Sequence, residues 1–293
     1  MPSPFVRRRR LAAAIRKVRE DRDMTADELA RRVYRSRAQI TRLETGQCRP
    51  DLAHLMDILD VLEITGRQRN QLIRLARDAA ERGWWDSFGD TMGPRQKLYA
   101  DLESAADTIR EYSQTAMPAA LQTPEFTQAL VELDTCEGPL SYRPERMAEA
   151  RARRQEHLLQ PNGPKYEAVL DESMIHRLAV TSEAKATQLR HLITVVSGDE
   201  RIIVQVLPSD VPIPGGLLPR SSFSLYTFPE RSDPPLAVVD TVTTDLVLDQ
   251  RKDLGRYVTM YDRLRKAALS PANSLSFLSE LAARLSEQTG SET

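Results

Sequence analysis

The segment Thr25-Ala-Asp-Glu-Leu-Ala-Arg-Arg-Val-Tyr-Arg-Ser-Arg-Ala-Gln-Ile-Thr-Arg-Leu-Glu44 carries the start signals of two short helices. Thr25 and Glu28 have the spacing of a capping box, in which the hydroxyl accepts from the amide three residues later and the carboxylate reaches back. Ser36 is a second N-cap candidate. Two short helices joined by a tight turn predict a helix-turn-helix, whose second helix fits the major groove of DNA.

The second of these helices is expected to have two chemically different faces. Ile40 and Leu43 lie three residues apart and mark the face turned toward the protein core. Arg37, Ala38 and Arg42 fall near one outward line. Arginine can bond bidentately to guanine and glutamine to adenine, so this face suits base recognition. A helical hairpin with a charged surface shows the same pattern and is the alternative at this point.

Charge is distributed unevenly along the chain. Residues 1–50 hold 14 basic and six acidic side chains, a net charge of +8, whereas the remaining 243 residues have a net charge of −9. This asymmetry indicates a polyanion-binding head joined to an acidic body. The tetrad Arg7 to Arg10 is expected to be either an arm on DNA phosphates or a disordered, solvated stretch.

The head resembles the Cro/cI, or xenobiotic-response-element, family of repressors over about residues 10–65. The resemblance is carried by Glu28-Leu29-Ala30, by Ile40-Thr41-Arg42-Leu43-Glu44, and by Gly46 and Pro50. It implies a five-helix domain that binds double-stranded DNA through its third helix.

The same resemblance assigns roles to individual positions. Base edges are touched from the positions of Arg37, Ala38 and Arg42, and Gln39 reaches a phosphate or an edge base. Phosphates are contacted from Thr25 and Ala26 at the start of the second helix, and from Gln47 and Arg49 after the third. Arg19 and Glu44 match a structural salt bridge between the first and third helices.

One position departs from the family pattern. The family usually has Gly in the turn where this chain has Tyr34. A bulky residue at positive φ is strained by about 1–2 kcal/mol. Either the turn is altered in this chain or Tyr34 accepts the strain.

Composition excludes several classes of protein. The 293 residues are 41% hydrophobic and 28% charged, as in a folded, soluble protein. No apolar run approaches the roughly 18 residues of a membrane helix, and no apolar segment follows the basic N-terminus, so we expect no secretory signal and a cytoplasmic location. Cys48 and Cys136 form no disulfide framework, and no His or Cys spacing indicates a metal site.

The chain is expected to comprise a helix-turn-helix domain over residues 1–82 and a larger domain over residues 83–293. The larger domain is predicted to be helical over 95–160 and α+β over 161–287, giving a mainly α protein with an α+β C-terminal domain. A long helix is expected through Leu98 to Ile109. Strands are predicted at 166–170, 201–207, 222–228 and 236–242, followed by helices at 246–268 and 274–285.

The body carries little recognisable chemistry. It has no phosphate-binding glycine loop and no nucleophile turn. Trp84-Trp85 is interpreted as packing, and Asp171-Glu172 as the cap of the next helix. The irregular loop from Asp210 to Pro219 is of the kind that frames pockets. A pair formed by Glu172 and Asp240 would favour an enzyme.

The body also resembles an uncharacterised domain that follows this kind of helix-turn-helix in many actinomycete regulators. The matching motifs include Gly83-Trp84-Trp85, Val169-Leu170-Asp171-Glu172 and Ala268-Leu269-Ser270-Pro271. Where this family often has Pro-Gly-Leu-Leu-Gln-Thr, the chain has Pro118-Ala-Ala-Leu-Gln-Thr123.

These observations predict a DNA-binding transcriptional regulator that is not an enzyme and has no cofactor. We expect a homodimer and a C-terminal domain that binds a ligand or a small regulatory protein. Helices near 143–159 or 246–268 would hold such a protein, and an exposed apolar patch on either would argue for it. The alternative is an enzyme that carries a DNA-binding head.

Overall fold

The computed structural model describes residues 2–136, 142–177, 180–216, 218–241 and 243–291. These residues form two compact units. The first comprises Met1–Ser87, Lys97–Ala105 and Pro229–Pro234, and the second comprises Phe88–Gln96, Ala106–Phe228 and Pro235–Thr293. The first unit therefore includes two segments that lie far from its main part in the sequence.

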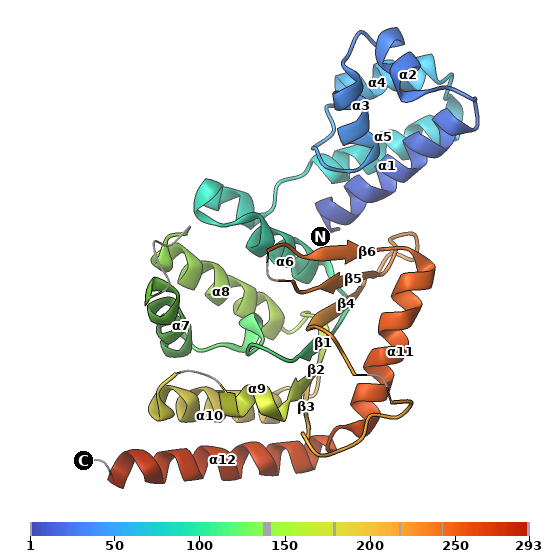
Figure 1. Ribbon diagram of the computed structural model, residues 1–293. Helices are drawn as coiled ribbons and strands as arrows, with labels where there is room; N and C mark the ends of the chain where they lie inside the picture. Colours follow the sequence, from blue (N-terminus) through green and yellow to red (C-terminus); the bar gives the residue numbers. More distant parts are fainter. Residues whose placement is uncertain (1, 137–141, 178–179, 217, 242, 292–293) are drawn as a thin grey trace. The chain divides into compact units, whose positions relative to one another are not determined.

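The first unit is a helical domain. Its helices are α1 (Pro4–Glu20), α2 (Ala26–Arg32), α3 (Arg37–Glu44), α4 (Leu52–Val61) and α5 (Gly66–Ala80) (Figure 1). All five helices contribute to one apolar core, with members such as Ile15, Leu29, Ile40, Ile58 and Ala76, each fully buried. Five helices around one core agree with the expectation for the head.

Local signals set where these helices begin. Thr25 accepts a hydrogen bond from the Glu28 amide (3.1 Å) at the start of α2. The Glu28 carboxylate bonds Arg32 rather than reaching back, so this capping box is only half formed. α1 begins at Pro4, because Ser3 caps it by accepting from the Val6 amide (3.1 Å).

The second unit contains a six-stranded sheet with helices around it. Its strands are β1 (Thr108–Ser113), β2 (Lys165–Asp171), β3 (Ile202–Leu207), β4 (Phe223–Thr227), β5 (Leu236–Val239) and β6 (Leu246–Leu248). Its α-helices are α7 (Pro124–Cys136), α8 (Pro144–Leu159), α9 (Glu172–Arg177), α10 (Ser182–Gly198), α11 (Arg251–Ala267) and α12 (Pro271–Ser291). A short 3-10 turn, η2 (Ala119–Leu121), follows β1. The segments η1 (Trp84–Thr91) and α6 (Pro94–Ala105) are divided between the two units.

The sheet is mixed, with strand order β3-β2-β1-β4-β5-β6. β1, β2 and β3 are parallel, whereas β4, β5 and β6 pair antiparallel. One row across the sheet runs through Gln205, Val169, Tyr112, Phe223 and Val239. The predicted fold class, mainly α with an α+β C-terminal part, is confirmed.

α11 covers one face of the sheet. Tyr261 and Leu264 of α11 pack against Val169, Leu207 and other side chains of this face. Figure 1 shows α11 on one side of the sheet, α7 to α10 on the other, and α12 beside β3. The end of the α11-covered face, at the β3 edge, is therefore framed by α11 and by the segment that leads into α12.

Two expectations about this unit were wrong. The helix predicted through Ile109 ends at Ala105, and residues 108–113 form β1 in the centre of the sheet. The helix predicted from residue 246 begins at Arg251, after the short strand β6. β1 forms because it pairs with β2 and β4, which are distant in the sequence, whereas β6 pairs with the nearby β5. Local periodicity reports neither pairing. The strand predicted over 236–242 ends at Val239, and Val242 lies outside the described residues.

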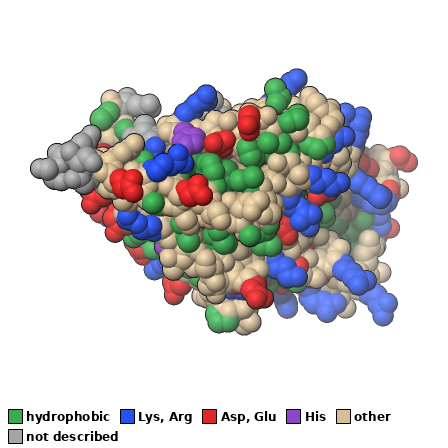
Figure 2. All heavy atoms as spheres, turned by 90° about the horizontal axis from the view of Figure 1, so that it is seen from below, with side chains coloured by type: hydrophobic (Ala, Val, Ile, Leu, Met, Phe, Trp, Pro, Cys, Tyr) green, Lys and Arg blue, Asp and Glu red, His purple; other side chains and the backbone are tan. Residues whose placement is uncertain are grey.

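No helix in the described part of the chain is long and apolar enough to cross a membrane. Figure 2 shows the face seen from below, where side chains of both charge signs stand among hydrophobic ones. Charge of a single sign therefore does not mark this face as a polyanion site.

Candidate nucleic-acid interface

The start of α3 is fixed by a complete capping box. The Ser36 hydroxyl accepts from the Gln39 amide (3.3 Å), and Gln39 Oε1 accepts from the Ser36 amide (3.0 Å). Gln39 Oε1 thus already accepts a hydrogen bond from the protein. The side-chain amide nitrogen of Gln39 is left as the group that could donate to DNA. This use of Gln39 was not anticipated from the sequence, although the spacing from Ser36 to Gln39 is the capping-box signal.

α3 separates a buried face from an exposed one, as expected. Ile40 has no exposed surface and Leu43 is 6% exposed. Arg37, Ala38 and Arg42 are all exposed. Arg37 makes a loose ion pair with Asp27 (3.4 Å) between two exposed side chains. Such a pair is worth at most about 1 kcal/mol, so it leaves the guanidinium available to a ligand.

Arg19 and Glu44 join α1 to α3. Arg19 Nε and Nη2 donate to the two Glu44 carboxylate oxygens at 2.6 and 2.8 Å, and Nη1 donates to the Met24 carbonyl at 2.6 Å. Both side chains are largely buried, and the hydrogen bond with Glu44 raises the pKa of Arg19. The pair fixes the carboxyl end of α3 against α1, which makes it a positioning element.

The remaining positions assigned from the head's resemblance lie at both ends of the α2–α3 pair. Thr25 is exposed at the N-cap of α2 and Ala26 is the first helical residue. Gln47 and Arg49 are exposed after α3. Arg49 is not free, because its Nη2 bonds Asp86 at 2.5 Å. Asp86 also accepts from the Gly83 amide (3.0 Å), so an acceptor within the protein competes with DNA for Arg49.

The turn between α2 and α3 contains Tyr34 in a left-handed conformation. Its φ is +54°, so the turn keeps the left-handed conformation and Tyr34 accepts the strain. Its side chain is 92% exposed, and its amide donates to the Arg31 carbonyl at 3.2 Å. The aim of α3 is therefore set by an ordinary helix-turn-helix turn with an unusual residue in it.

The tetrad Arg7 to Arg10 is not a disordered stretch, because it lies within α1. Arg7 pairs with Asp233 (3.0 Å), with Asp78 (3.4 Å) and with Glu230. Arg10 pairs with Asp233 (2.6 Å) and Glu230 (3.2 Å). Hydrogen bonds from Ser232 and Arg7 lower the pKa of Glu230 to about 2. The expectation of a disordered stretch is corrected. The partners Glu230 and Asp233 lie more than 200 residues away in the sequence.

Asp101 of α6 holds the first turn of α1. It accepts from the Ser3 hydroxyl and from the Phe5 amide (3.2 Å). Burial raises the pKa of Asp101 to about 6, against the lowering effects of Ser3, Arg8 and Phe5. No sequence signal connects Asp101 to α1, since the contact forms only on folding.

Other chemistry-bearing residues have structural surroundings. Trp85 is 6% exposed, and its ring meets the Trp84 ring edge to face at 5.9 Å. Asp171 caps α9 by accepting from the Ser173 amide (2.9 Å), as expected. Cys136 is an exposed free thiol. In the described ranges, no three His, Cys, Asp or Glu side chains gather as a metal site.

Glu172 and Asp240 do not form the pair that an enzyme reading would use. They follow β2 and β5, which are three strands apart in the sheet, or about 14 Å at the usual spacing. Glu172 accepts from the Ser209 amide (2.8 Å), and this bond is the main cause of its lowered pKa. Asp240 pairs with Arg95.

Comparison with known proteins gave a match in each part of the chain. A helix-turn-helix domain matches residues 10–72, which contain α2 and α3 and indicate DNA as a partner. A domain of unknown function, DUF5753, matches residues 96–280. No curated protein and no solved structure gave a significant match. Since the second match spans more than half of the chain, the protein belongs to the DUF5753 family, with a helix-turn-helix domain at its N-terminal side.

Proposed function

We propose that the protein is a sequence-specific transcriptional regulator that inserts α3 into the major groove of double-stranded DNA. The observation that carries the proposal is the two-faced α3, with Ile40 and Leu43 buried and Arg37, Ala38 and Arg42 exposed. An arginine donates two parallel hydrogen bonds to guanine, and the small Ala38 lets the backbone approach the base edges. This reading is also the one that resemblance to the Cro/cI family favours.

Phosphate contacts would orient α3 in the groove. Thr25 and Ala26 stand at the N-terminus of α2, where the helix dipole favours a phosphate. Gln47 and Arg49 follow α3, and Gln39 retains a free amide nitrogen. These contacts fix register and carry no sequence information of their own. The proposed DNA-contacting surface of the protein therefore extends beyond the three base-facing residues.

We further propose that the protein binds as a homodimer. A helix-turn-helix dimer reads two half-sites about 34 Å apart, or a multiple of that distance. A footprint with one half-site only would contradict this part of the proposal without affecting the assignment of α3.

The DUF5753 part is proposed to bind a small ligand or a small partner protein and to control DNA binding. For a protein partner, an exposed apolar patch would be expected on α8 or α11. Among the described residues of these two helices, the large hydrophobic side chain with substantial exposure is Leu159, at 37%. A ligand is therefore favoured over a helix-bound protein.

The proposal gives the chain no catalytic step of its own. The enzyme alternative rested on Glu172 and Asp240, and these carboxylates are held on separate strands by Ser209 and Arg95. Assignment of a reaction would need a different pair of groups.

Selection of genomic fragments by the full-length protein would supply an operator, and fluorescence anisotropy would then measure its affinity. Arg37→Ala and Arg42→Ala should each weaken binding by about 1–3 kcal/mol and relax specificity at one base position. Arg16→Ala is the matched control, because Arg16 is an exposed arginine of α1 paired with Glu20. Operator binding as tight as wild type by both α3 variants would overturn the proposal.

A further inference from the structure

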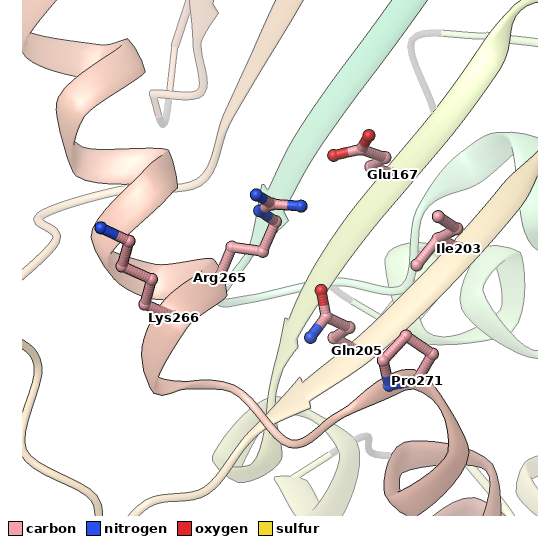
Figure 3. Close-up of a pocket in the computed structure, with 6 residues that line it drawn as sticks. All are labelled: Glu167, Ile203, Gln205, Arg265, Lys266 and Pro271. Carbon is pink, nitrogen blue, oxygen red and sulfur yellow. The ribbon is translucent and has the colours of Figure 1, made fainter.

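A cavity of about 250 Å³ lies where the α11-covered face of the sheet ends at β3. It is lined by Glu167, Ile203, Gln205, Arg265, Lys266 and Pro271 (Figure 3). These residues come from β2, β3, α11 and the first position of α12, and all of them belong to the second unit. The cavity is thus built within one unit from four elements.

The sheet supplies the floor of the cavity. Glu167 on β2 pairs in register with Ile203 on β3, so the two side chains lie next to each other on one face. Gln205 is two residues further along β3 and points to the same face. The segment after α11 closes one end, since the Leu269 amide donates to the Val206 carbonyl (2.8 Å) and Pro271 begins α12.

Two hydrogen-bond acceptors face the cavity from the sheet. Gln205 Nε2 donates to the Leu269 carbonyl at 2.7 Å, which fixes the amide group. Figure 3 shows the Gln205 oxygen turned toward the cavity. The Glu167 carboxylate has Oε2 buried without a hydrogen bond, 3.6 Å from Arg110 Nε, which also has none. The pairing of Glu167 is therefore incomplete in the protein itself.

One cation, Arg265, faces these acceptors from the last turn of α11, and Lys266 also borders the cavity. Figure 3 shows the Arg265 guanidinium and the Glu167 carboxylate directed toward one another across the cavity. Both Arg265 and Lys266 are exposed, and neither forms an ion pair with a residue in the described ranges. Cations at this end of a helix are favoured by its dipole, and that interaction leaves their hydrogen-bond donors free.

We infer that this cavity binds a small zwitterion, an α-amino acid with an aliphatic side chain. Glu167 and Gln205 would accept from its ammonium group, while Arg265 would donate to its carboxylate. Ile203 and Pro271 supply the apolar wall for its side chain. A single ligand of this class satisfies both charge signs, which neither a simple anion nor a simple amine does.

The size of the cavity favours this class over larger ligands. Sites for drug-sized molecules have volumes of about 300–1,000 Å³, so a cavity of about 250 Å³ suits a small metabolite. The inference deepens the proposed function by naming a ligand class for the DUF5753 part. Its test measures ligand binding without DNA, so its failure is distinguishable from a failure of the protein to recognise DNA.

Isothermal titration calorimetry of the full-length protein would test the inference with L-alanine, L-valine, L-leucine and L-isoleucine. For the tightest of these, the amine without the carboxylate and the acid without the ammonium are the matched controls. The variant Glu167→Gln keeps the side-chain shape and removes the negative charge, and Arg265→Gln removes the positive charge. Glu280→Gln and Arg251→Gln change exposed residues elsewhere on α12 and α11.

We expect saturable binding of at least one amino acid, weakened at least about tenfold in each control compound and in the Glu167 and Arg265 variants. The Glu280 and Arg251 variants should bind as wild type does. Absence of binding up to millimolar concentration would overturn the inference. Equal binding of the acid or amine analogue, or equal binding by the Glu167 and Arg265 variants, would overturn it as well.

Discussion

Two sets of arginines in the first unit have opposite environments. Arg7 and Arg10 of α1 are paired with Glu230 and Asp233, and Arg7 is only 7% exposed. Arg37 and Arg42 of α3 are exposed, and Arg37 has one loose partner. Both sets contribute equally to the net charge of residues 1–50. A basic composition therefore locates a polyanion-binding domain, whereas burial and pairing decide which cations can meet the polyanion.

The largest expected effect is the loss of stability in Arg7→Ala. The variant leaves Asp233, whose side chain is 4% exposed, with Arg10 as its remaining cationic partner among the described residues. Removing one member of a buried ion pair costs about 3–5 kcal/mol, and we expect the lower end because Arg10 remains. Urea denaturation would measure it, with Arg16→Ala expected to change stability by less than about 0.5 kcal/mol.

DNA binding by the folded Arg7→Ala protein tests separately whether Arg7 contacts DNA. We expect an operator affinity close to that of wild type, measured where both proteins are fully folded. A weaker affinity without a loss of stability would show that Arg7 contacts DNA after all.

The next effect concerns pH and the anchor of α1. The pKa of Asp101 is raised to about 6, from 3.8, so the folded protein binds this proton more tightly than the unfolded chain does. Its contribution to stability is complete below pH 4 and is lost as the pH rises through 6. The stability of wild type relative to Asp101→Asn should therefore fall by about 2–3 kcal/mol between pH 4 and pH 7.

Denaturation of both proteins across this pH range isolates the Asp101 contribution, because all other titrating groups are shared. A constant difference between the two proteins would contradict the buried, proton-binding state of Asp101.

A smaller effect is expected at the turn that joins α2 to α3. Tyr34→Gly relieves the strain of a positive φ but increases the entropy of the unfolded chain, so we expect a net gain of about 1 kcal/mol. Urea midpoints of wild type and variant would show it. A loss of DNA affinity in a more stable variant would place the exposed Tyr34 ring at the DNA.

The smallest effect concerns Arg49. Like the arginines of α3 it is exposed, and like those of α1 it is paired within the protein. Asp86→Asn weakens the pairing that holds Arg49, which is worth about 0.5 kcal/mol for such an exposed pair. Operator affinity should rise about twofold at low salt, and Arg49→Ala should abolish the gain. An unchanged affinity would leave Arg49 as a structural residue.

The head could be predicted closely because its signals are local. The caps Thr25 and Ser36 and the apolar pair Ile40 and Leu43 act within one or two helical turns. The exposed arginines of α3 follow from the same periodicity. The positive φ of Tyr34 could be anticipated only as one of two outcomes, because the turn geometry is imposed by α2 and α3 together.

The body could be predicted only in part, because its sheet pairs strands that are distant in the sequence. β-branched runs predict four of the strands. The apolar pattern through Ile109 predicts a helix where β1 lies, because β1 depends on pairing with β2 and β4. The partners of Arg7, Arg10 and Arg49 were missed for the same reason. The cavity beside Gln205 depends on four elements, and no motif in the sequence brings them together.

The first unit is built from three separate stretches of the chain, so one continuous fragment does not contain all of it. A fragment cut after residue 82 would keep α3 intact but would lack Asp101, Glu230 and Asp233. Its first helix would then lose the Glu230 and Asp233 partners of Arg7 and Arg10 and the Asp101 contact at its first turn. Such a shortened protein would attract nucleic acid of any sequence more strongly than the full chain, and it would be a poor reporter of operator choice.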